Sequence, residues 1–452
     1  MNLEKDTIKI LEKALHVLEA GFNDLPQLAY DFDLAAIERV LLEAAEKMQD
    51  NYPYFHPLYA GQMLKPPHPV ARLAYMLSLW INPNNHALDG GRASSQLEKE
   101  AVAEIAGLFQ WDDFLGHLTG GGTMANMEAL WIAGKLKPRM KVLASSQAHY
   151  THQRLSDVLG LEFEAVPCDE NGRMDIVALK EMLREGNVGT VVATIGTTGT
   201  GAVDPLAEII ELQQRFEFRL HADAAYGGYF ILADNLHPKT RRAFDHLKNV
   251  DSIVIDPHKH GLQPYGCGCV LFRDPTVGRF YKHDSPYTYF TSAELHLGEI
   301  SLECSRAGAS ATALWTTQKL LPFVPNGHFA KDLAKCRKAA LWLFDKIKSD
   351  QRFRVIFQPE LDILVWAANG KSASEISQKS QYIFDAAADR NLHLATFSYP
   401  ASSLKNICQD VDFDQENVVC LRSCLMKPEH LQWVDRIWEI LEDVIKEVNS
   451  RT

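Results

Sequence analysis

The chain has 452 residues, of which 46% are hydrophobic and 23% are charged, the composition of an ordinary folded protein. Its length exceeds what one hydrophobic core usually fills, so a large domain with one or two smaller units is expected. A formal net charge of −12, with no basic run or basic helix face, argues against a nucleic-acid or anionic-membrane surface. The expected partner is therefore a small molecule.

The amino terminus and the cysteines indicate a cytoplasmic protein. The first 20 residues carry charges every few positions, so they do not form the apolar core of a signal peptide. The sequence contains no stretch of about 18 uncharged apolar residues, which argues against a membrane-spanning helix. The eight cysteines are scattered, so reduced thiols are expected, and neither Cys267 with Cys269 nor Cys420 with Cys424 has the spacing of a zinc site.

Helical periodicity predicts helices over residues 8–20 and 34–48, followed by a loop rich in proline, tyrosine and histidine over 52–69. From residue 97, short apolar runs alternate with amphipathic helices, which is typical of a mostly parallel sheet covered on both faces. The expected strands are 141–144, 162–166, 190–195, 218–222, 252–255 and 268–272. The expected helices are 125–136, 176–185, 206–216 and 309–321.

A stretch with two prolines and a glycine over 322–327 interrupts this pattern. A long helix over 329–347 then leads into a smaller region with strands at 363–367 and 417–425. The sequence therefore predicts three units: a helical amino-terminal segment of residues 1–75, a large domain of residues 76–325 and a small carboxy-terminal domain of residues 326–452.

Two polar residues that directly follow apolar runs are candidate site residues, because ligands of an open parallel sheet gather at the carboxyl ends of its strands. Asp223 precedes small residues that leave room above it, although an Asp capping a loop would look the same. Lys259 has apolar and histidine neighbours, which favour the neutral amine that condenses with an aldehyde. The alternative is a structural lysine at the surface, whose alkyl chain lies on apolar side chains while its amine stays in water.

A third element is the glycine run Gly120-Gly121-Gly122-Thr123, which opens a helix. Glycines let backbone N–H groups converge on an anion, and the helix dipole adds positive charge there. The run lacks the patterns of triphosphate and dinucleotide sites. It therefore favours a single phosphate monoester.

In combination these motifs resemble the group II pyridoxal-phosphate-dependent amino-acid decarboxylases, over about residues 56–428. The motifs that carry the resemblance, in the family's order, are Gly90-Gly-Arg-Ala-Ser-Ser-Gln-Leu-Glu98, Thr119-Gly-Gly-Gly-Thr-Met-Ala-Asn126, Ser145-Ser-Gln-Ala-His149, Thr194-Ile-Gly-Thr-Thr-Gly-Thr-Gly201, His221-Ala-Asp-Ala-Ala-Tyr-Gly-Gly228, Asp256-Pro-His-Lys259 and Leu421-Arg422. The resemblance implies an α/β fold of the aspartate-aminotransferase type, fold type I of the PLP-dependent transferases. It also implies pyridoxal 5'-phosphate as cofactor and a homodimer with an amino-acid substrate.

The resemblance also implies a role for each matching residue. Lys259 corresponds to the lysine that carries the cofactor as a Schiff base, Asp223 to the partner of the pyridine nitrogen, and His149 to the imidazole that stacks on the ring. The remaining expected cofactor contacts are Ala225 on the opposite face of the ring, Gly122, Thr123 and His258 at the phosphate, and Thr197 near the phenolic oxygen.

Arg422 is the candidate clamp for the substrate carboxylate, because a guanidinium in an apolar strand needs an anionic partner. The group that holds the carboxylate selects the reaction, since the bond to be broken must lie perpendicular to the cofactor ring. A structural ion pair is the alternative for Arg422. The stretch 283–296 lies where relatives carry a mobile loop, and Tyr287, Tyr289 and His296 are its candidate proton donors. The alternative is an aromatic pair packed at a subunit contact.

Three positions depart from the family pattern. Asp256 replaces a frequent Asn, and an acid there would repel a phosphate unless it points elsewhere, so it is left out of the cofactor set. His260 replaces an aromatic residue, and Cys304 replaces a glycine. These changes leave the substrate open. The competing functions are a carbon–carbon lyase of the sphingosine-phosphate lyase type, a cysteine desulfurase using Cys304, and an inactive regulatory relative.

Overall fold

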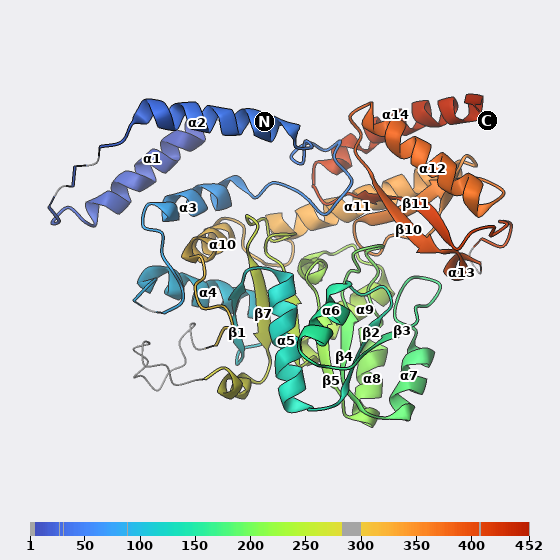
Figure 1. The fold of residues 1–452 in the computed structure, drawn as a ribbon, viewed down its shortest axis with the longest axis horizontal. Helices are drawn as coiled ribbons and strands as arrows, with labels where there is room; N and C mark the ends of the chain where they lie inside the picture. The colour runs from blue at the N-terminus through green and yellow to red at the C-terminus, as the bar shows by residue number, and fades with distance from the viewer. Residues whose placement is uncertain are drawn as a thin grey trace.

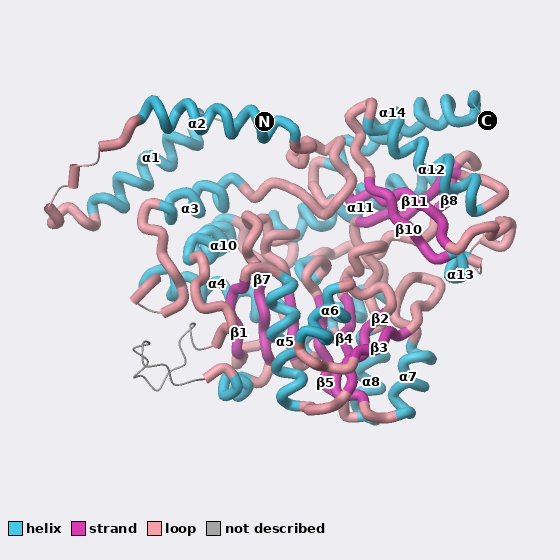
Figure 2. The backbone as a smooth tube through the Cα atoms, viewed as in Figure 1, coloured by secondary structure: helices cyan, strands magenta, loops and turns pink. Residues whose placement is uncertain are grey.

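The computed structural model describes residues 5–26, 28–29, 31–87, 89–282, 300–405 and 408–451. Two sheets organise this part of the chain (Figure 1, Figure 2). The seven-stranded sheet comprises β1 Leu115–Thr119, β2 Lys141–Ser145, β3 Phe163–Val166, β4 Val188–Thr194, β5 Arg219–Asp223, β6 Ser252–Ile255 and β7 Gly268–Phe272. The four-stranded sheet comprises β8 Phe353–Val355, β9 Ile363–Ala368, β10 Ala395–Pro400 and β11 Asn417–Cys424.

The helices alternate with these strands along most of the chain. They are α1 Lys5–Ala20, α2 Leu34–Lys47, α3 Pro69–Leu79, α4 Arg92–Leu108, α5 Gly122–Leu136, α6 Thr151–Val158, α7 Ile176–Glu185, α8 Leu206–Phe216, α9 Pro238–Asp245, α10 Gly308–Leu320, α11 His328–Ser349, α12 Ala373–Ala388, α13 Ala401–Leu404 and α14 His430–Arg451. No helix in the described ranges is both long enough and apolar enough to cross a membrane.

The large sheet has the strand order β1-β7-β6-β5-β4-β2-β3. Neighbours from β6 to β3 pair in parallel, and only β7 runs antiparallel to its two neighbours. The prediction of a mostly parallel sheet is therefore confirmed. The small sheet is antiparallel throughout.

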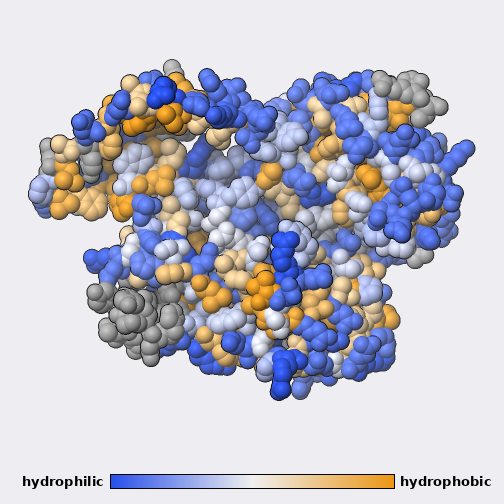
Figure 3. All heavy atoms as spheres, viewed as in Figure 1, coloured by the Kyte–Doolittle hydropathy of each residue, from blue (hydrophilic) through white to orange (hydrophobic). Residues whose placement is uncertain are grey.

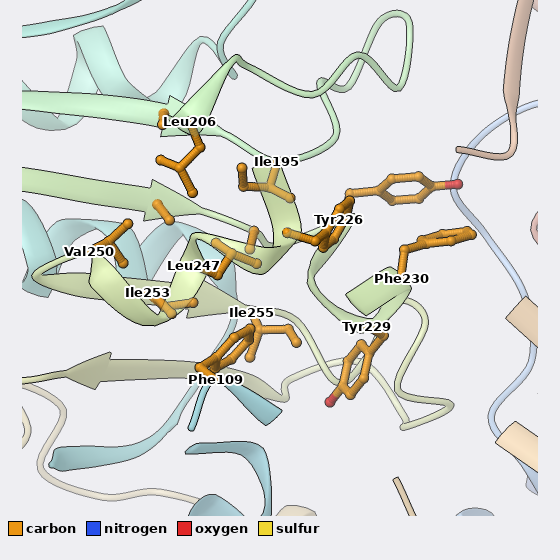
Figure 4. Packing of buried hydrophobic residues seen from close by; sticks show 14 of the residues in the cluster. Phe109, Ile195, Leu206, Tyr226, Tyr229, Phe230, Leu247, Val250, Ile253 and Ile255 are labelled. Atoms are coloured by element: carbon orange, nitrogen blue, oxygen red, sulfur yellow. The ribbon is translucent and has the colours of Figure 1, made fainter. Parts of the chain in front are cut away.

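Helices cover both faces of the large sheet. Successive residues of a strand point to opposite faces, so Val191 of β4 packs in one core and Val192 in another. The Val191 core includes side chains of α4, α7 and α8, and Figure 4 shows its aromatic and branched residues at close quarters. On the other face, α5 and α6 pack over the sheet. The strands read as continuous apolar runs because both faces are buried.

The small sheet packs against α11, α12 and α14. A segment near the amino terminus belongs to the same core, because Ala60 is fully buried there. Its backbone N–H donates to the carbonyl of His393, and its carbonyl accepts from the N–H of Cys424 at the end of β11. Residues far apart in the sequence therefore meet beside β11.

Candidate active site

The carboxyl ends of the parallel strands meet at one edge of the large sheet, where the expected site residues follow them. β5 ends at Asp223, and Asp256 directly follows β6. β1 runs in the direction of β6, because both pair antiparallel with β7. The glycine run after β1 is therefore brought to this same edge, where parallel sheets bind ligands.

A cavity of about 510 Å³ opens at this edge. All expected cofactor contacts except one line it, namely Gly122, Thr123, His149, Asp223, Ala225, His258 and Lys259. Thr197 is fully buried outside the lining, where its hydroxyl lies 2.8 Å from Thr200 Oγ1 and accepts the N–H of Ala202. The neighbouring Thr194 and Thr198 line the cavity instead.

Lys259 faces a carboxylate within this cavity. Its Nζ lies 3.0 Å from Oδ2 of Asp256, and Nε2 of His258 lies 3.6 Å from the same oxygen. Asp256 is buried, and its Oδ1 has no hydrogen-bond partner among the described residues. Asp256 thus points into the cavity and not away from it. The carboxylate that the sequence analysis left out of the cofactor set is part of the wall.

Asp223 is held in place from behind. Its Oδ2 lies 2.7 Å from Nε2 of His152, and its Oδ1 accepts the N–H of Ala225 at 3.2 Å. Burial alone would raise the pKa of Asp223, but the hydrogen bond with His152 and the charge of Lys259 outweigh it and lower this pKa below its ordinary value. The side of Asp223 that faces the cavity therefore presents a carboxylate and not a carboxylic acid.

His149 begins the segment that leads into α6. Its Nδ1 lies 2.8 Å from Oγ1 of Thr151, which fixes the ring orientation. Burial lowers the pKa of His149, so the imidazole is neutral near pH 7. A neutral ring at the cavity wall suits stacking on a flat heteroaromatic group.

The glycine run has space for an anion but not for side chains. A Cβ at Gly121 would lie 3.3 Å from the ring of His258, and Gly121 has a φ of +149°. A Cβ at Gly122 would lie 2.6 Å from Oδ2 of Asp256. The first N–H of the run, from Gly120, donates to Glu303 Oε2 at 2.8 Å, and the following amides open α5.

These observations fit pyridoxal 5'-phosphate. The amino end of α5 and His258, whose buried Nδ1 has no partner among the described residues, would hold the phosphate. Asp223 would hold the pyridine nitrogen, and His149 and Ala225 would flank the ring. Two carboxylates, those of Asp256 and Glu303, also line this part of the cavity. The region expected to bind the phosphate therefore contains negative charges beside the glycine amides.

Arg422 lies in β11, outside the set that lines the cavity, and is 4% exposed. Its Nη1 donates to Gln62 Oε1 at 3.0 Å and to the carbonyl of Gly61 at 3.4 Å. Its Nε and Nη2 have no partner among the described residues. Burial raises the pKa of Tyr226, a residue of the cavity wall, and the charge of Arg422 weakly opposes this shift. Two nitrogens of a buried guanidinium are therefore left without a partner in the described chain, which is costly unless an anion pairs with them.

Tyr226 donates a hydrogen bond of 2.6 Å to Oδ1 of Asp362, which is fully buried. His260 Nε2 lies 3.2 Å from the other carboxylate oxygen. Asp362, the residue that precedes β9, therefore contacts both the loop after β5 and the loop that contains Lys259. The candidate proton donors Tyr287, Tyr289 and His296 lie outside the described residues.

Sequence reasoning missed several residues around the site. His152 had one available signal, since it follows His149 by only three residues. Tyr226 and Asp256 stood inside quoted motifs without a role. No sequence pattern marked Gln62 as a site residue, because its partner Arg422 lies 360 residues away and the two meet only in the folded chain.

Comparisons with known proteins agree with this geometry. The pyridoxal-dependent decarboxylase conserved domain matches residues 126–368. A probable L-tyrosine/L-aspartate decarboxylase of Methanothermobacter thermautotrophicus is 29% identical over 330 residues, which are 71% of this chain and 85% of that protein. The L-aspartate decarboxylase of Thermococcus kodakarensis is 29% identical over 336 residues, 73% of this chain and 84% of that protein.

Similarity to solved structures supports the same fold. The crystal structure of mouse CSAD superposes with a TM-score of 0.78 at 20% identity, covering 96% of this chain and 91% of that one. The crystal structure of Oryza sativa TDC with PLP and tryptamine gives a TM-score of 0.77 at 15% identity, covering 99% of each. The expected fold type I is confirmed. The chain belongs to the pyridoxal-dependent decarboxylase family, carboxy-lyases that use pyridoxal 5'-phosphate.

Proposed function

We propose that the chain is an L-amino-acid decarboxylase that carries pyridoxal 5'-phosphate as a Schiff base on Lys259 and releases carbon dioxide and the corresponding amine. The observation that carries this proposal is the buried guanidinium of Arg422, whose Nε and Nη2 have no partner among the described residues, together with a cavity that contains Lys259 and Asp223. When bound, the cofactor supplies an electron sink for the pair left by the broken bond.

The residues of the chain divide the remaining work among them. Asp223 keeps a proton on the pyridine nitrogen, since its carboxylate stays ionised. His149 and Ala225 hold the ring between them, and the amides at the start of α5 hold the phosphate with His258. Arg422 holds the substrate carboxylate and sets which bond stands perpendicular to the ring. Gln62 orients Arg422 through the 3.0 Å hydrogen bond.

Arg422 also separates this function from the alternatives. A carbon–carbon lyase acts on a substrate without the carboxylate and has no need of an unpaired guanidinium edge. Cys304, the acceptor required for a desulfurase, is exposed and is not among the residues that line the cavity. An inactive relative would not need Lys259, Asp223 and His149 in one cavity.

Substrate choice is a further part of the proposal. The relatives quoted above are named for L-tyrosine and L-aspartate, so these two amino acids are the first substrates to test. The deciding experiment is an assay of carbon dioxide and amine release by the purified, cofactor-loaded chain across the twenty amino acids, ornithine and diaminobutyrate. Amine from none of them, with intact cofactor absorbance, would overturn the proposal.

We also propose a cytoplasmic homodimer in which the amino-terminal helices contact the partner subunit. None of the residues of α2 is buried, and Leu34, Leu41 and Leu42 are exposed. Figure 3 shows hydrophobic side chains gathered over these helices at the upper left. Exposed apolar faces of this kind mark contact sites.

We also propose that the chain divides into three units, residues 1–75, 76–325 and 326–452.

A further inference from the structure

His152 lies directly behind Asp223, on the side away from the cavity. It belongs to the first turn of α6 and is 0% exposed. Its Nε2 lies 2.7 Å from Oδ2 of Asp223, whereas its Nδ1 has no hydrogen-bond partner among the described residues. His152 is not among the described residues that line the cavity, and its contact with the site is this carboxylate.

The hydrogen-bond pattern fixes the tautomer. An ionised carboxylate only accepts hydrogen bonds, so the nitrogen at 2.7 Å carries the proton. His152 therefore donates a hydrogen bond from its Nε2–H to Oδ2 of Asp223.

The other groups around Asp223 do not replace this contact. Lys259 and His149 line the same cavity, and within the described residues the second oxygen of Asp223 accepts the N–H of Ala225, at 3.2 Å. His221, on the same strand, uses Nδ1 with Ser252 Oγ and Nε2 with Asn126 Oδ1, both at 2.9 Å. His152 is thus the one side chain, within the described parts of the chain, that hydrogen-bonds the Asp223 carboxylate.

We propose that His152 is a positioning residue that holds the Asp223 carboxylate ionised and aimed at the cofactor's pyridine nitrogen. This inference rests on the proposed function, because it assigns Asp223 to that nitrogen. Without the donated hydrogen bond, burial would favour the carboxylic acid, and the ring nitrogen would lose its proton partner. His152 therefore serves to keep the pyridine nitrogen of the cofactor protonated. It is not needed for the folding of α6.

The test uses two amide variants whose side chains differ in length. In His152→Gln the amide nitrogen lies near the position of Nε2 and can donate to Asp223. In His152→Asn the side chain is too short to reach Asp223. We expect His152→Asn to lower turnover by about 10- to 100-fold, the effect of losing one charge-assisted hydrogen bond, and His152→Gln to stay within about 3-fold of wild type. Ser156→Ala, one turn later on α6 at a buried hydroxyl without a partner in the described chain, is the matched control.

Two further measurements separate positioning from packing. Titrating pyridoxal 5'-phosphate into cofactor-free protein should give a dissociation constant about 10-fold higher for His152→Asn, with a shifted pH dependence of the visible absorbance. In the double variant with Asp223→Asn, the losses should not multiply, since His152 acts through Asp223. Multiplying losses, or a His152→Asn variant with wild-type absorbance and turnover, would overturn the inference. A wild-type chain that acquires no visible absorbance with the cofactor would instead overturn the proposed function.

Discussion

Lys259 and Asp256 form an ion pair, with 3.0 Å between the amine nitrogen and a carboxylate oxygen three residues earlier on the same loop. Condensation of the amine with an aldehyde consumes its charged form and so breaks this ion pair. Asp256 also adds negative charge where the phosphate is expected. The carboxylate therefore opposes cofactor binding in two ways.

We expect Asp256→Asn to bind pyridoxal 5'-phosphate about 10-fold more tightly than wild type, because it removes both the ion pair and a like charge. Absorbance titration of the cofactor-free protein measures this, with the exposed Asp112→Asn as control. If Asp256→Asn instead binds the cofactor more weakly, the carboxylate helps to hold it.

Lys259→Ala should abolish the visible absorbance of the covalently held cofactor and all turnover, since no other amine lines the cavity within the described residues. The fold should be retained, because Lys259 is partly exposed and its only ion-pair partner in the described chain is Asp256. Circular dichroism and an absorbance spectrum check both points, and Lys338→Ala on the exposed face of α11 is the control. An unchanged spectrum for Lys259→Ala would remove this lysine from the mechanism.

Arg422→Met should lower kcat/KM for the carboxylated substrate by about 30- to 1,000-fold, because a bidentate charge-assisted contact is lost. Cofactor absorbance should be unchanged, since Arg422 does not line the cofactor cavity. Gln62→Ala, which removes only the orienting hydrogen bond, should cost about 10-fold. Steady-state kinetics distinguish these variants from the exposed control Arg436→Met. Full activity of Arg422→Met would favour the lyase instead.

The stability of the chain should fall in mild acid because of His221. Burial lowers the pKa of His221 to about 3 from an ordinary 6.5. Between these pH values the unfolded chain binds a proton that the folded chain does not, so the free energy of unfolding decreases as the pH falls from about 6.5 to about 3. His221→Asn should flatten this slope in thermal unfolding curves, whereas the exposed His16→Asn should not. Equal slopes for wild type and His221→Asn would assign the acid sensitivity to other groups.

Leu41→Asp should convert the proposed dimer into monomers, since it places a charge on the exposed apolar face of α2. Sedimentation velocity measures the change, and Glu46→Lys on the polar face of the same helix is the control. A monomeric wild-type chain would contradict the dimer itself.

Elements with local start and stop signals were predictable from the sequence. α7 begins and ends at the expected residues, because the side chain of Asp175 accepts the N–H groups of Val177 and Ala178 and because Gly186 has a φ of +85°. β1 was not predicted. Its His117 is fully buried against Glu128 at 2.9 Å, so the strand lacks the apolar run that marks its neighbours.

The same distinction applies to the site. Motifs that lie within one loop, such as the glycine run and the segment before Lys259, could be identified because their spacing alone reflects the chemistry. The contacts of His152 with Asp223 and of Gln62 with Arg422 join different elements. No local pattern encodes such pairs, because their distance is set by the packing of α6 on the sheet and of the amino-terminal segment on β11.

The Arg422–Gln62 hydrogen bond, which closes 360 residues of chain, also bears on the order of folding. Contacts of such sequence separation form late, because their loop-closure entropy is not recovered until the intervening structure exists. On the ribosome, the strands that build the cofactor cavity are complete long before β11 emerges. The nascent chain is therefore expected to form its cofactor cavity first. The placement of Arg422, the proposed contact for the substrate carboxylate, follows at the end of maturation.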